Sequence, residues 1–311
     1  MSSPLMDLLG ELSERTSLKF EKQPKVIAKD DSFAVESLPV DAAEWHSIED
    51  VVCVYFDLKS STNLAKGRTP ASTASIYDAG VGGVVKILRK LGADFVDIQG
   101  DGGFGLFWGA GRYERAMTAA ITIRSFSSDF TSQLESKWEN APTTGFKIGV
   151  SSGPIMAKVV GLPRQKDYQE PVWAGRPVNY AAKAAQQTTP EELVVTGSVW
   201  DSIRDNDFLM FTCGCPDASE PAVIWRAVTL DKIPDGDRYG QGLQSYWCPI
   251  HGEEFCNAVL KGRKHRDEVR ESSRSALNLI GYGTEELLDA SKLRKLERDE
   301  SKAVLAKLSR E

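Results

Sequence analysis

The chain has 311 residues, of which 41% are hydrophobic and 26% are charged, and its formal net charge is −6 with a pI near 5.4. These values are typical of a soluble globular protein with one large or two small domains. They argue against nucleic acid as a partner, because no basic stripe is present to match phosphate charge. No apolar run is long enough to cross a bilayer, the N-terminus lacks the basic region of a signal peptide, and the five cysteines are an odd number. We therefore expect a cytoplasmic protein without membrane contact and without a disulfide framework.

The sequence pattern divides the chain into three parts. Residues 1–46 are expected to form a short amphipathic helix followed by a linker. Residues 47–230 alternate apolar runs rich in β-formers with segments of helical spacing, which indicates an α/β domain. Residues 231–311 are expected to begin as a linker and to become helical, since residues 264–311 are strongly charged and contain no proline.

The expected elements of the middle part follow one another in the order βααββαββαβ. This order predicts an α/β sandwich of the α+β type, with a mixed or antiparallel sheet. The apolar runs expected as strands include 51–58, the two arms of 95–109 with a Gly-rich turn between them, 145–153 and 154–161. The segments expected as helices include 71–91, 112–137 and 177–187.

Two aspartates follow apolar strand segments and are candidates for one shared site. Asp57 ends the strand at 51–58, and Asp101 lies in the turn of "QGDGG". If the two strands are neighbours, both carboxylates converge at one edge of the sheet, where they suit divalent cations that carry a nucleoside triphosphate. Ser60, Ser61 and Thr62 would offer backbone N–H groups to its phosphates. The alternative is structural: Asp101 stabilises the turn, and Asp57 caps the helix that follows it.

Four motifs favour the metal site over the structural alternative. They are "FDLKSST" (56–62), "QGDGGFGLFWG" (99–109), "KIGVSSGPIMAKVVG" (147–161) and "WAGRPVNYAAKAA" (173–185). In this order and at these spacings they resemble the catalytic domain of class III nucleotide cyclases. The resemblance implies a ferredoxin-like βαββαβ core with N- and C-terminal extensions. It also implies a head-to-tail homodimer in which both subunits contribute to each active site.

The resemblance places two divalent metal ions, Mn²⁺ or Mg²⁺, at Asp57 and Asp101, with Leu58 beside them. It implies that one ion activates the ribose 3′-hydroxyl of a nucleoside triphosphate, and that the other neutralises the triphosphate and helps pyrophosphate leave. The residues around the first aspartate are expected at the substrate, namely Phe56, Ser60, Ser61 and Thr62.

The helix expected at 177–187 carries the residues that the resemblance makes catalytic. Asn179 matches the asparagine that orients the ribose. Lys183 stands where the family usually has an arginine that stabilises the pentavalent transition state, and a lysine keeps the charge but not the bidentate fork. Arg176, just before this helix, is the alternative source of that charge.

Two further positions bear on the choice of base. Asp97 occupies the place of a lysine that donates to adenine in adenylate cyclases, and an ionised carboxylate only accepts hydrogen bonds. It would repel adenine N1 but could accept from the N3–H of uracil, the N1–H of guanine or the amino group of cytosine. Tyr55 shares a strand face with Asp57 and would narrow the pocket for a smaller base, unless it is simply a core aromatic residue.

This combination resembles the pyrimidine cyclases of bacterial antiphage (Pycsar) systems, a branch of the class III family. The resemblance implies synthesis of cyclic UMP or cyclic CMP, which activates a separately encoded effector. Uracil is favoured, because Asp97 pairs directly with an imino N3–H that cytosine lacks. The alternatives are a cytidylate cyclase, a guanylate cyclase and a catalytically silent module of the same fold that binds a nucleotide or a partner.

Cysteine and histidine residues gather in two later stretches, "CGC" and "CPIHGEEFC". Thiolate and imidazole groups are the ligands of structural zinc, so a tetrahedral site is one interpretation. The alternative is a set of reduced thiols near a domain joint. The candidate zinc ligands are Cys213, Cys215, Cys248, His251 and Cys256.

Overall fold

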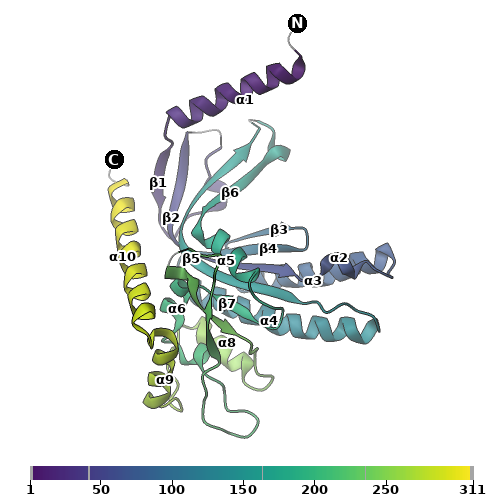
Figure 1. Cartoon of the computed structure of the whole chain (residues 1–311), viewed down its shortest axis with the longest axis vertical. Coiled ribbons are helices and arrows are strands. Elements are labelled where there is room, and N and C mark those ends of the chain that lie inside the picture. The colour runs from purple at the N-terminus through teal and green to yellow at the C-terminus, as the bar shows by residue number, and fades with distance from the viewer. Residues whose placement is uncertain (1–2, 41–42, 163, 235, 309–311) are drawn as a thin grey trace.

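The structure is a computed structural model that describes residues 3–40, 43–162, 164–234 and 236–308 (Figure 1). Nine strands form one sheet with the continuous order β3-β4-β2-β5-β7-β9-β8, while β1 pairs with β2 and β6 pairs with β5. The strands are β1 Lys25–Lys29, β2 Glu44–Leu58, β3 Phe95–Gln99, β4 Gly102–Phe107, β5 Phe146–Gly161, β6 Gln169–Gly175, β7 Leu193–Val195, β8 Trp225–Thr229 and β9 Tyr239–Leu243.

The ferredoxin-like core that the sequence predicts is confirmed. Strand β2 lies between β4 and β5, and β3 lies outside β4, with all three pairings antiparallel. Two long helices, α3 Pro70–Lys90 and α4 Arg112–Lys137, connect these strands in the order βαββαβ. The remaining helices up to β8 are α2 Ser61–Leu64, α5 Arg176–Ala185, α6 Gly197–Ile203 and α7 Asp207–Met210.

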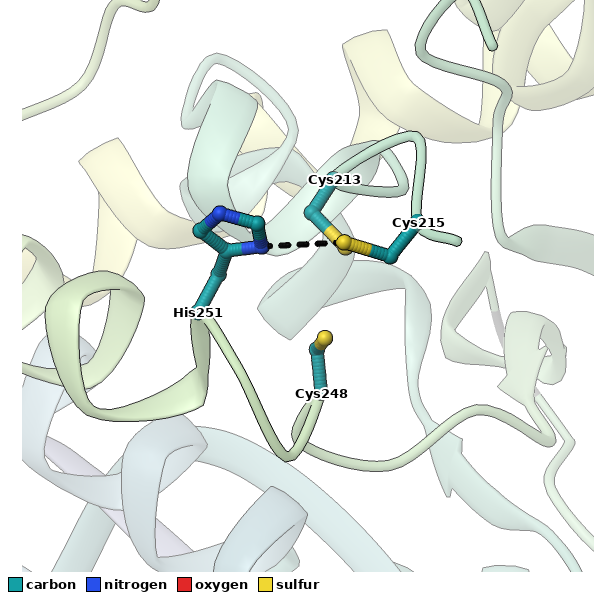
Figure 2. A group of neighbouring side chains, drawn as sticks. All are labelled: Cys213, Cys215, Cys248 and His251. Carbon is teal, nitrogen blue, oxygen red and sulfur yellow. Dashed lines mark hydrogen bonds between the residues drawn. The ribbon is translucent and has the colours of Figure 1, made fainter. Parts of the chain in front are cut away.

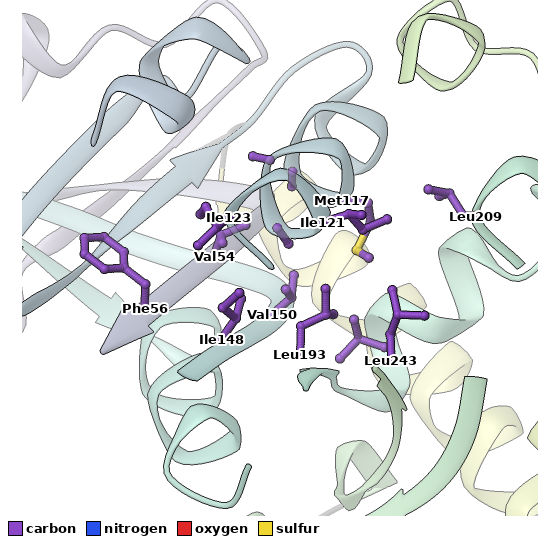
Figure 3. Close-up of a cluster of buried hydrophobic side chains, with 14 of the residues drawn as sticks. Val54, Phe56, Met117, Ile121, Ile123, Ile148, Val150, Leu193, Leu209 and Leu243 are labelled. Atoms are coloured by element: carbon purple, nitrogen blue, oxygen red, sulfur yellow. The ribbon is translucent and has the colours of Figure 1, made fainter. Parts of the chain in front are cut away.

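The alternation of side chains along β2 creates two apolar layers, one on each face of the sheet. Val54 and Phe56 belong to the larger core, which contains residues of α3 and α4 (Figure 3). Val51 and Cys53 point to the opposite face and share a second core with Ala181 of α5. Asp57 and Tyr55 have the same parity as Cys53, so they emerge on the face that α5 covers.

Three segments differ from the sequence-based expectation. The expected linker before residue 47 contains β1, whose parallel pairing with β2 puts Ala28 beside Ser47. The expected linker after residue 230 contains β9, where a side chain at Gly240 would collide with the carbonyl oxygen of Val195 at 2.5 Å. Glycine permits that close approach but lowers strand propensity, which hides the strand in the sequence. The expected pair 145–153 and 154–161 is one strand, β5.

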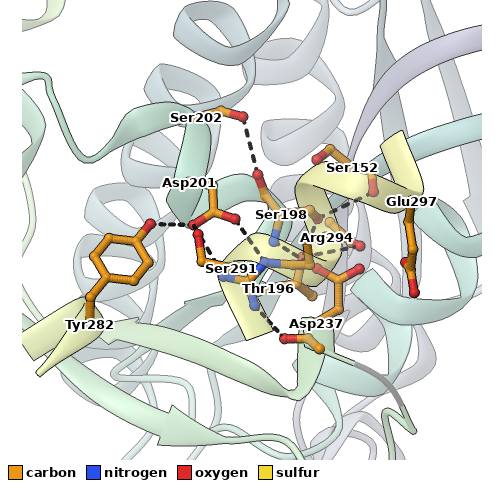
Figure 4. A network of polar contacts seen from close by, with 12 residues as sticks. Ser152, Thr196, Ser198, Asp201, Ser202, Asp237, Tyr282, Ser291, Arg294 and Glu297 are labelled. Carbon is orange, nitrogen blue, oxygen red and sulfur yellow. Dashed lines mark hydrogen bonds and ion pairs between the residues drawn. The ribbon is translucent and has the colours of Figure 1, made fainter. Parts of the chain in front are cut away.

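The C-terminal part of the chain is helical and is anchored to the α/β domain. It contains α8 Gly252–Leu260, α9 Glu271–Tyr282 and α10 Glu285–Leu308. On α10 the guanidinium of Arg294 is buried, pairs with Asp201 of α6 at 2.8 Å and donates to the carbonyl oxygen of Gly236 (Figure 4). Tyr282 also donates to Asp201. A charged network around the buried Arg294 therefore joins residues 282–294 to α6 and to Gly236.

The N-terminal helix α1 runs over Pro4–Glu21, which is longer than the short helix expected there, and contains no buried residue. Short 3₁₀ turns, η1 Val35–Ser37, η2 Lys166–Tyr168 and η3 Gly236–Arg238, complete the described elements. None of the helices in the described ranges has both the length and the apolar character that a membrane span requires.

Candidate active site

The two candidate metal ligands lie together, as the sequence predicts. Asp57 is the Cα partner of Gly102, the residue after Asp101, and the backbone N–H of Leu58 donates to the carbonyl oxygen of Asp101 at 3.2 Å. A Cβ at Gly102 would stand 2.7 Å from the carbonyl oxygen of Phe56, so only glycine allows this close pairing. Hence the β3–β4 turn holds Asp101 beside the end of β2.

Burial and like charge together disfavour the ionised form of Asp57, and one lysine opposes them. Burial raises the pKa of the half-buried Asp57, the negative charge of Asp101 raises it further, and Lys147 lowers it. The pKa of Tyr55 is raised by burial and then by the charges of Asp57 and Asp101. Two neighbouring carboxylates, one of them with a raised pKa, are a donor set that fits a divalent cation.

The candidate base-reading residues occupy the next row of the same sheet face. Asp97 on β3 and Tyr55 on β2 are both Cα partners of Phe104 on β4. Directly paired residues in an antiparallel sheet point to the same face, so these side chains lie on the face that carries Asp57. Gln99 Nε2 donates to Asp97 Oδ2 at 2.9 Å. Tyr55 is half-buried at the edge of the second core. This position allows both roles that the sequence leaves open, packing in the core and contact with a substrate.

Lys147 belongs to this site, although the sequence analysis does not select it. It lies on β5 directly opposite Asp57, as Gly102 does on the other side. Its charge reaches the Asp57 carboxyl, since it lowers the pKa of that group. A lysine at the start of a strand carries no signal of its own until the strand register is known.

The residues next to Asp57 in the chain differ in which of their groups can contact a metal ion or a substrate. The side chains of Phe56 and Leu58 are buried in the larger core, so only their backbone groups can face a metal ion or a substrate. Ser60 has a left-handed backbone conformation, with φ of 59°, and precedes the four-residue helix α2. Ser61 and Thr62 form the first turn of α2, and a helix of one turn has a small dipole, so any phosphate contact there depends on single N–H groups.

The candidate catalytic residues of α5 contact groups other than the two carboxylates. Asn179 is exposed, and its amide donates to the carbonyl oxygen of Gly175 at 3.2 Å. Lys183 lies with its ammonium group 5.5 Å from the ring centroid of Tyr180. Arg176 pairs with Glu297 of α10 at 3.0 Å. Among the described residues, no hydrogen bond or ion pair connects Asn179 or Lys183 to either aspartate.

The cysteine-rich segments form a separate cluster, in which four of the five predicted ligands meet (Figure 2). The ligand atoms of Cys213, Cys215, Cys248 and His251 all lie within 4.8 Å of one another. Cys256 is not part of this group and lies on α8, so the set of five is wrong in that one member. The cysteines are free thiols.

Comparisons with known proteins agree with this fold and site. The profile of adenylate and guanylate cyclase catalytic domains matches residues 44–215. A uridylate cyclase of Micromonospora echinofusca is 49% identical over 88% of this chain and 90% of its own length, and a uridylate cyclase of Propioniciclava tarda is 42% identical over 95% and 96%. The crystal structure of the adenylyl cyclase CyaB from P. aeruginosa shares the fold, with a TM-score of 0.52, 14% identity and coverage of 64% of this chain and 95% of that chain.

A fold of this topology, with two aspartates at the β2 end and the β3–β4 turn, is that of a class III nucleotide cyclase. The chain belongs to the family of adenylate and guanylate cyclase catalytic domains. The resemblance noted in the sequence is thereby confirmed.

Proposed function

We propose that this nucleotide cyclase converts UTP to 3′,5′-cyclic UMP and pyrophosphate. The observation that carries the proposal is the shared sheet face on which the acceptor Asp97 and the aromatic Tyr55 stand next to the metal-ligand pair Asp57 and Asp101. The names of the two relatives, both uridylate cyclases, support the same base. CTP and GTP remain the alternative substrates, because their bases also carry N–H donors.

Asp57 and Asp101 are proposed to hold two divalent ions, Mn²⁺ or Mg²⁺, with backbone carbonyl groups near Phe56 and Leu58 as further oxygen donors. When bound, such ions lower the pKa of the ribose 3′-hydroxyl and neutralise charge on the triphosphate. The charge of Asp101 disfavours ionisation of Asp57, and a bound dication would remove that penalty by neutralising both carboxylates. Lys147, opposite Asp57, is placed to contact the phosphates.

The reaction forms one bond and breaks one bond at the α-phosphorus. The ribose 3′-oxygen attacks, loses its proton and becomes part of the cyclic diester, while the bond from the α-phosphorus to the bridging oxygen of pyrophosphate breaks. Positioning and charge supply most of the catalysis in phosphoryl transfer. Asn179 is proposed to hold the ribose, and Lys183 to stabilise the charge that develops on the phosphoryl oxygens. Arg176 could contribute only after release from Glu297.

Base recognition is proposed to depend on one oxygen of Asp97. Gln99 occupies Oδ2 and fixes the carboxylate, while Oδ1 accepts no hydrogen bond from the described residues. This oxygen can accept from the N3–H of uracil. The phenol ring of Tyr55 lies one row from the metal ligands and would limit the depth of the pocket, which disfavours a purine.

Each active site is proposed to combine Asp57 and Asp101 of one chain with Asn179 and Lys183 of a second copy in a head-to-tail homodimer. The proposal is supported by the finding that, among the described residues, no hydrogen bond or ion pair joins Asn179 or Lys183 to either aspartate. A complementation experiment tests it: Asp57→Ala chains and Lys183→Ala chains, each inactive alone, should regain partial activity when mixed. Mixed heterodimers that remain inactive would contradict shared sites.

The substrate test is incubation of the protein with each of the four nucleoside triphosphates and Mn²⁺, followed by mass spectrometry of the products. Cyclic UMP is expected, and Asp57→Ala should form none. Cyclic CMP or cyclic GMP as the main product would overturn the choice of base, and no product from any nucleotide would favour the silent binding module.

The biological role is proposed to be an antiphage second messenger in the cytoplasm, read by a separately encoded effector. The motif resemblance to pyrimidine cyclases of antiphage systems supports the role, and the free thiols support a reducing compartment. The test is phage plating on cells that carry the cyclase with its neighbouring genes. Protection that disappears in the Asp101→Ala variant is expected, and protection unchanged by that substitution would contradict the role.

A further inference from the structure

Three thiols and one imidazole meet between the loop before β8 and the segment that leads into α8 (Figure 2). Cys213 and Cys215 come from the loop, while Cys248 and His251 come from the segment before α8. Cys215 Sγ lies 3.2 Å from His251 Nδ1. Two sulfur ligands on a tetrahedral zinc ion are separated by about 3.8 Å, and a sulfur and a nitrogen by about 3.6 Å. We propose that these four side chains bind one structural zinc ion.

The backbone around the cluster suits two short ligand-bearing turns. Gly214, between the first two cysteines, has φ of +81°, and a Cβ there would stand 2.3 Å from the carbonyl oxygen of Ser219. The tight Cys-Gly-Cys turn therefore requires glycine. In the second turn the N–H of Gly252 donates to the carbonyl oxygen of Cys248 at 2.7 Å, which closes the turn that carries Cys248 and His251.

The ligand set identifies the site as structural. Three cysteines and one histidine fill a tetrahedral zinc ion and leave no open position for a water molecule or a substrate, unlike a catalytic zinc site. Soft thiolates also select zinc over Mg²⁺ and Mn²⁺, which prefer the oxygen donors of Asp57 and Asp101. In the sheet order, those aspartates are on β2 and the β3–β4 turn, while the cluster adjoins β9 and β8.

A metal cross-link is useful at this place because packing between the two segments is incomplete. A cavity of about 210 Å³ lies against the cluster, with Cys213, Cys215 and Cys248 among its lining residues and the apolar side chains of Phe208 and Phe255 beside them. The loop before β8 and the chain after β9 both lead away from an antiparallel strand pair that ends at Trp225 and Leu243. Zinc would join these two diverging segments and hold α8 against α4 and α7.

Metal analysis of the full-length protein tests this proposal independently of cyclase activity. Protein purified without chelators and without a histidine tag should contain about one zinc ion per chain by mass spectrometry of the metal. Cys248→Ser should lose this zinc, while Cys256→Ser, a free thiol in the same region but outside the cluster, should retain it. The double variant Asp57→Ala/Asp101→Ala should also retain it, which separates this site from the catalytic metals. Co²⁺ in place of zinc should give the strong absorption bands of a tetrahedral thiolate site.

Two results would overturn the proposal. One is wild-type protein that contains no zinc and, after reduction and chelator treatment, takes up none in a titration against a chromophoric zinc indicator. The other is equal zinc content in Cys248→Ser and Cys256→Ser. The wild-type titration covers the case in which Cys248→Ser does not fold.

Discussion

Lys147 lies directly opposite Asp57 on the neighbouring strand, and its charge opposes the two effects, burial and Asp101, that raise the pKa of the Asp57 carboxyl. One cation beside two carboxylates leaves the site with a net negative charge, which divalent ions can reverse. A triphosphate that arrives with these ions would meet Lys147 on the far side of Asp57. The register of β2 and β5 thus places a positive group where the phosphates are expected.

The first prediction concerns this lysine. Lys147→Ala should lower kcat/KM for UTP by about 10- to 100-fold, since a charged hydrogen bond to phosphate is typically worth about 1.5–3 kcal/mol. Lys147→Arg should retain most activity. Steady-state kinetics with Mn²⁺ measures both, and Lys86→Ala on the exposed side of α3 is the matched control. Equal kinetics in Lys147→Ala and Lys86→Ala would exclude a phosphate contact.

The second prediction is that Asp57, a proposed metal ligand, destabilises the metal-free protein. The folded state raises the pKa of Asp57, so it retains this proton to a higher pH than the unfolded chain does. Stability from this group therefore falls as pH rises through the folded pKa, and the ionised form is unfavourable at pH 7. Asp57→Asn should raise the Tm of the metal-free protein at pH 7 by about 1–3 °C, while activity is lost.

The effect of divalent ions on the Tm tests the same prediction in a second way. Because ligands that bind only the folded state stabilise it, Mn²⁺ should raise the Tm of the wild type. It should not raise the Tm of Asp57→Asn or of Asp101→Asn. Thermal denaturation at pH 5 and pH 7, with and without Mn²⁺, separates the effects. A lower Tm for Asp57→Asn at pH 7, or a wild-type Tm that does not change with Mn²⁺, would contradict the assignment.

The convergence of Asp57 and Asp101 could be predicted because two signals agreed, an apolar strand that ends in aspartate and a glycine-rich hairpin turn. The strands β1 and β9 could not be predicted, since β1 has lysine at both ends and β9 has two glycines in five residues. Their pairing depends on β2 and β7, which are distant in sequence. Lys147 was missed for the same reason, because strand register is a tertiary property.

The membership of the cysteine cluster could also be predicted only in part from the sequence. The spacing of Cys248 and His251 predicts a short ligand turn, and the structure has one. Cys256 is also close to Cys248 and His251 in the sequence. However, Cys256 lies within α8, whereas His251 precedes that helix. Which of the later cysteines meets Cys213 and Cys215 is decided by how α8 packs, and composition carries no information on that packing.

The third prediction concerns the depth of the base pocket. Tyr55→Ala should lower the preference for UTP over ATP in kcat/KM by roughly 10-fold or more, since the removed ring no longer excludes a purine. Tyr55→Phe keeps the ring and should keep the preference. Competition between UTP and ATP, read by mass spectrometry of the cyclic products, gives the ratio directly. An unchanged ratio in Tyr55→Ala would leave the residue with a packing role alone.

The fourth prediction concerns Asp97. In Asp97→Asn the amide can donate as well as accept, so the penalty against cytosine, whose N3 is an acceptor, disappears. The preference for UTP over CTP should fall by about 10- to 100-fold. A hydrogen bond to a charged group is worth about 1.5–3 kcal/mol, and its loss gives a change of this size. Gln99→Ala, which removes only the neighbour that holds Asp97, should give a smaller change of the same sign. A preference that rises or stays constant in Asp97→Asn would show that another group reads the base.

The fifth prediction concerns the attachment of α10, where Arg294 is buried and pairs with Asp201 (Figure 4). Arg294→Ala removes one partner of a buried pair and should lower the free energy of unfolding by about 2–4 kcal/mol, because Asp201 is then left with neutral donors only. Lys292→Ala, two residues earlier on the same helix, breaks an exposed pair with Asp289 and should change it by less than about 0.5 kcal/mol. Urea denaturation followed by circular dichroism measures both. If the two variants unfold at the same urea concentration, this network does not hold α10 in place. The network would then not position Glu297 of α10 for its ion pair with Arg176 either.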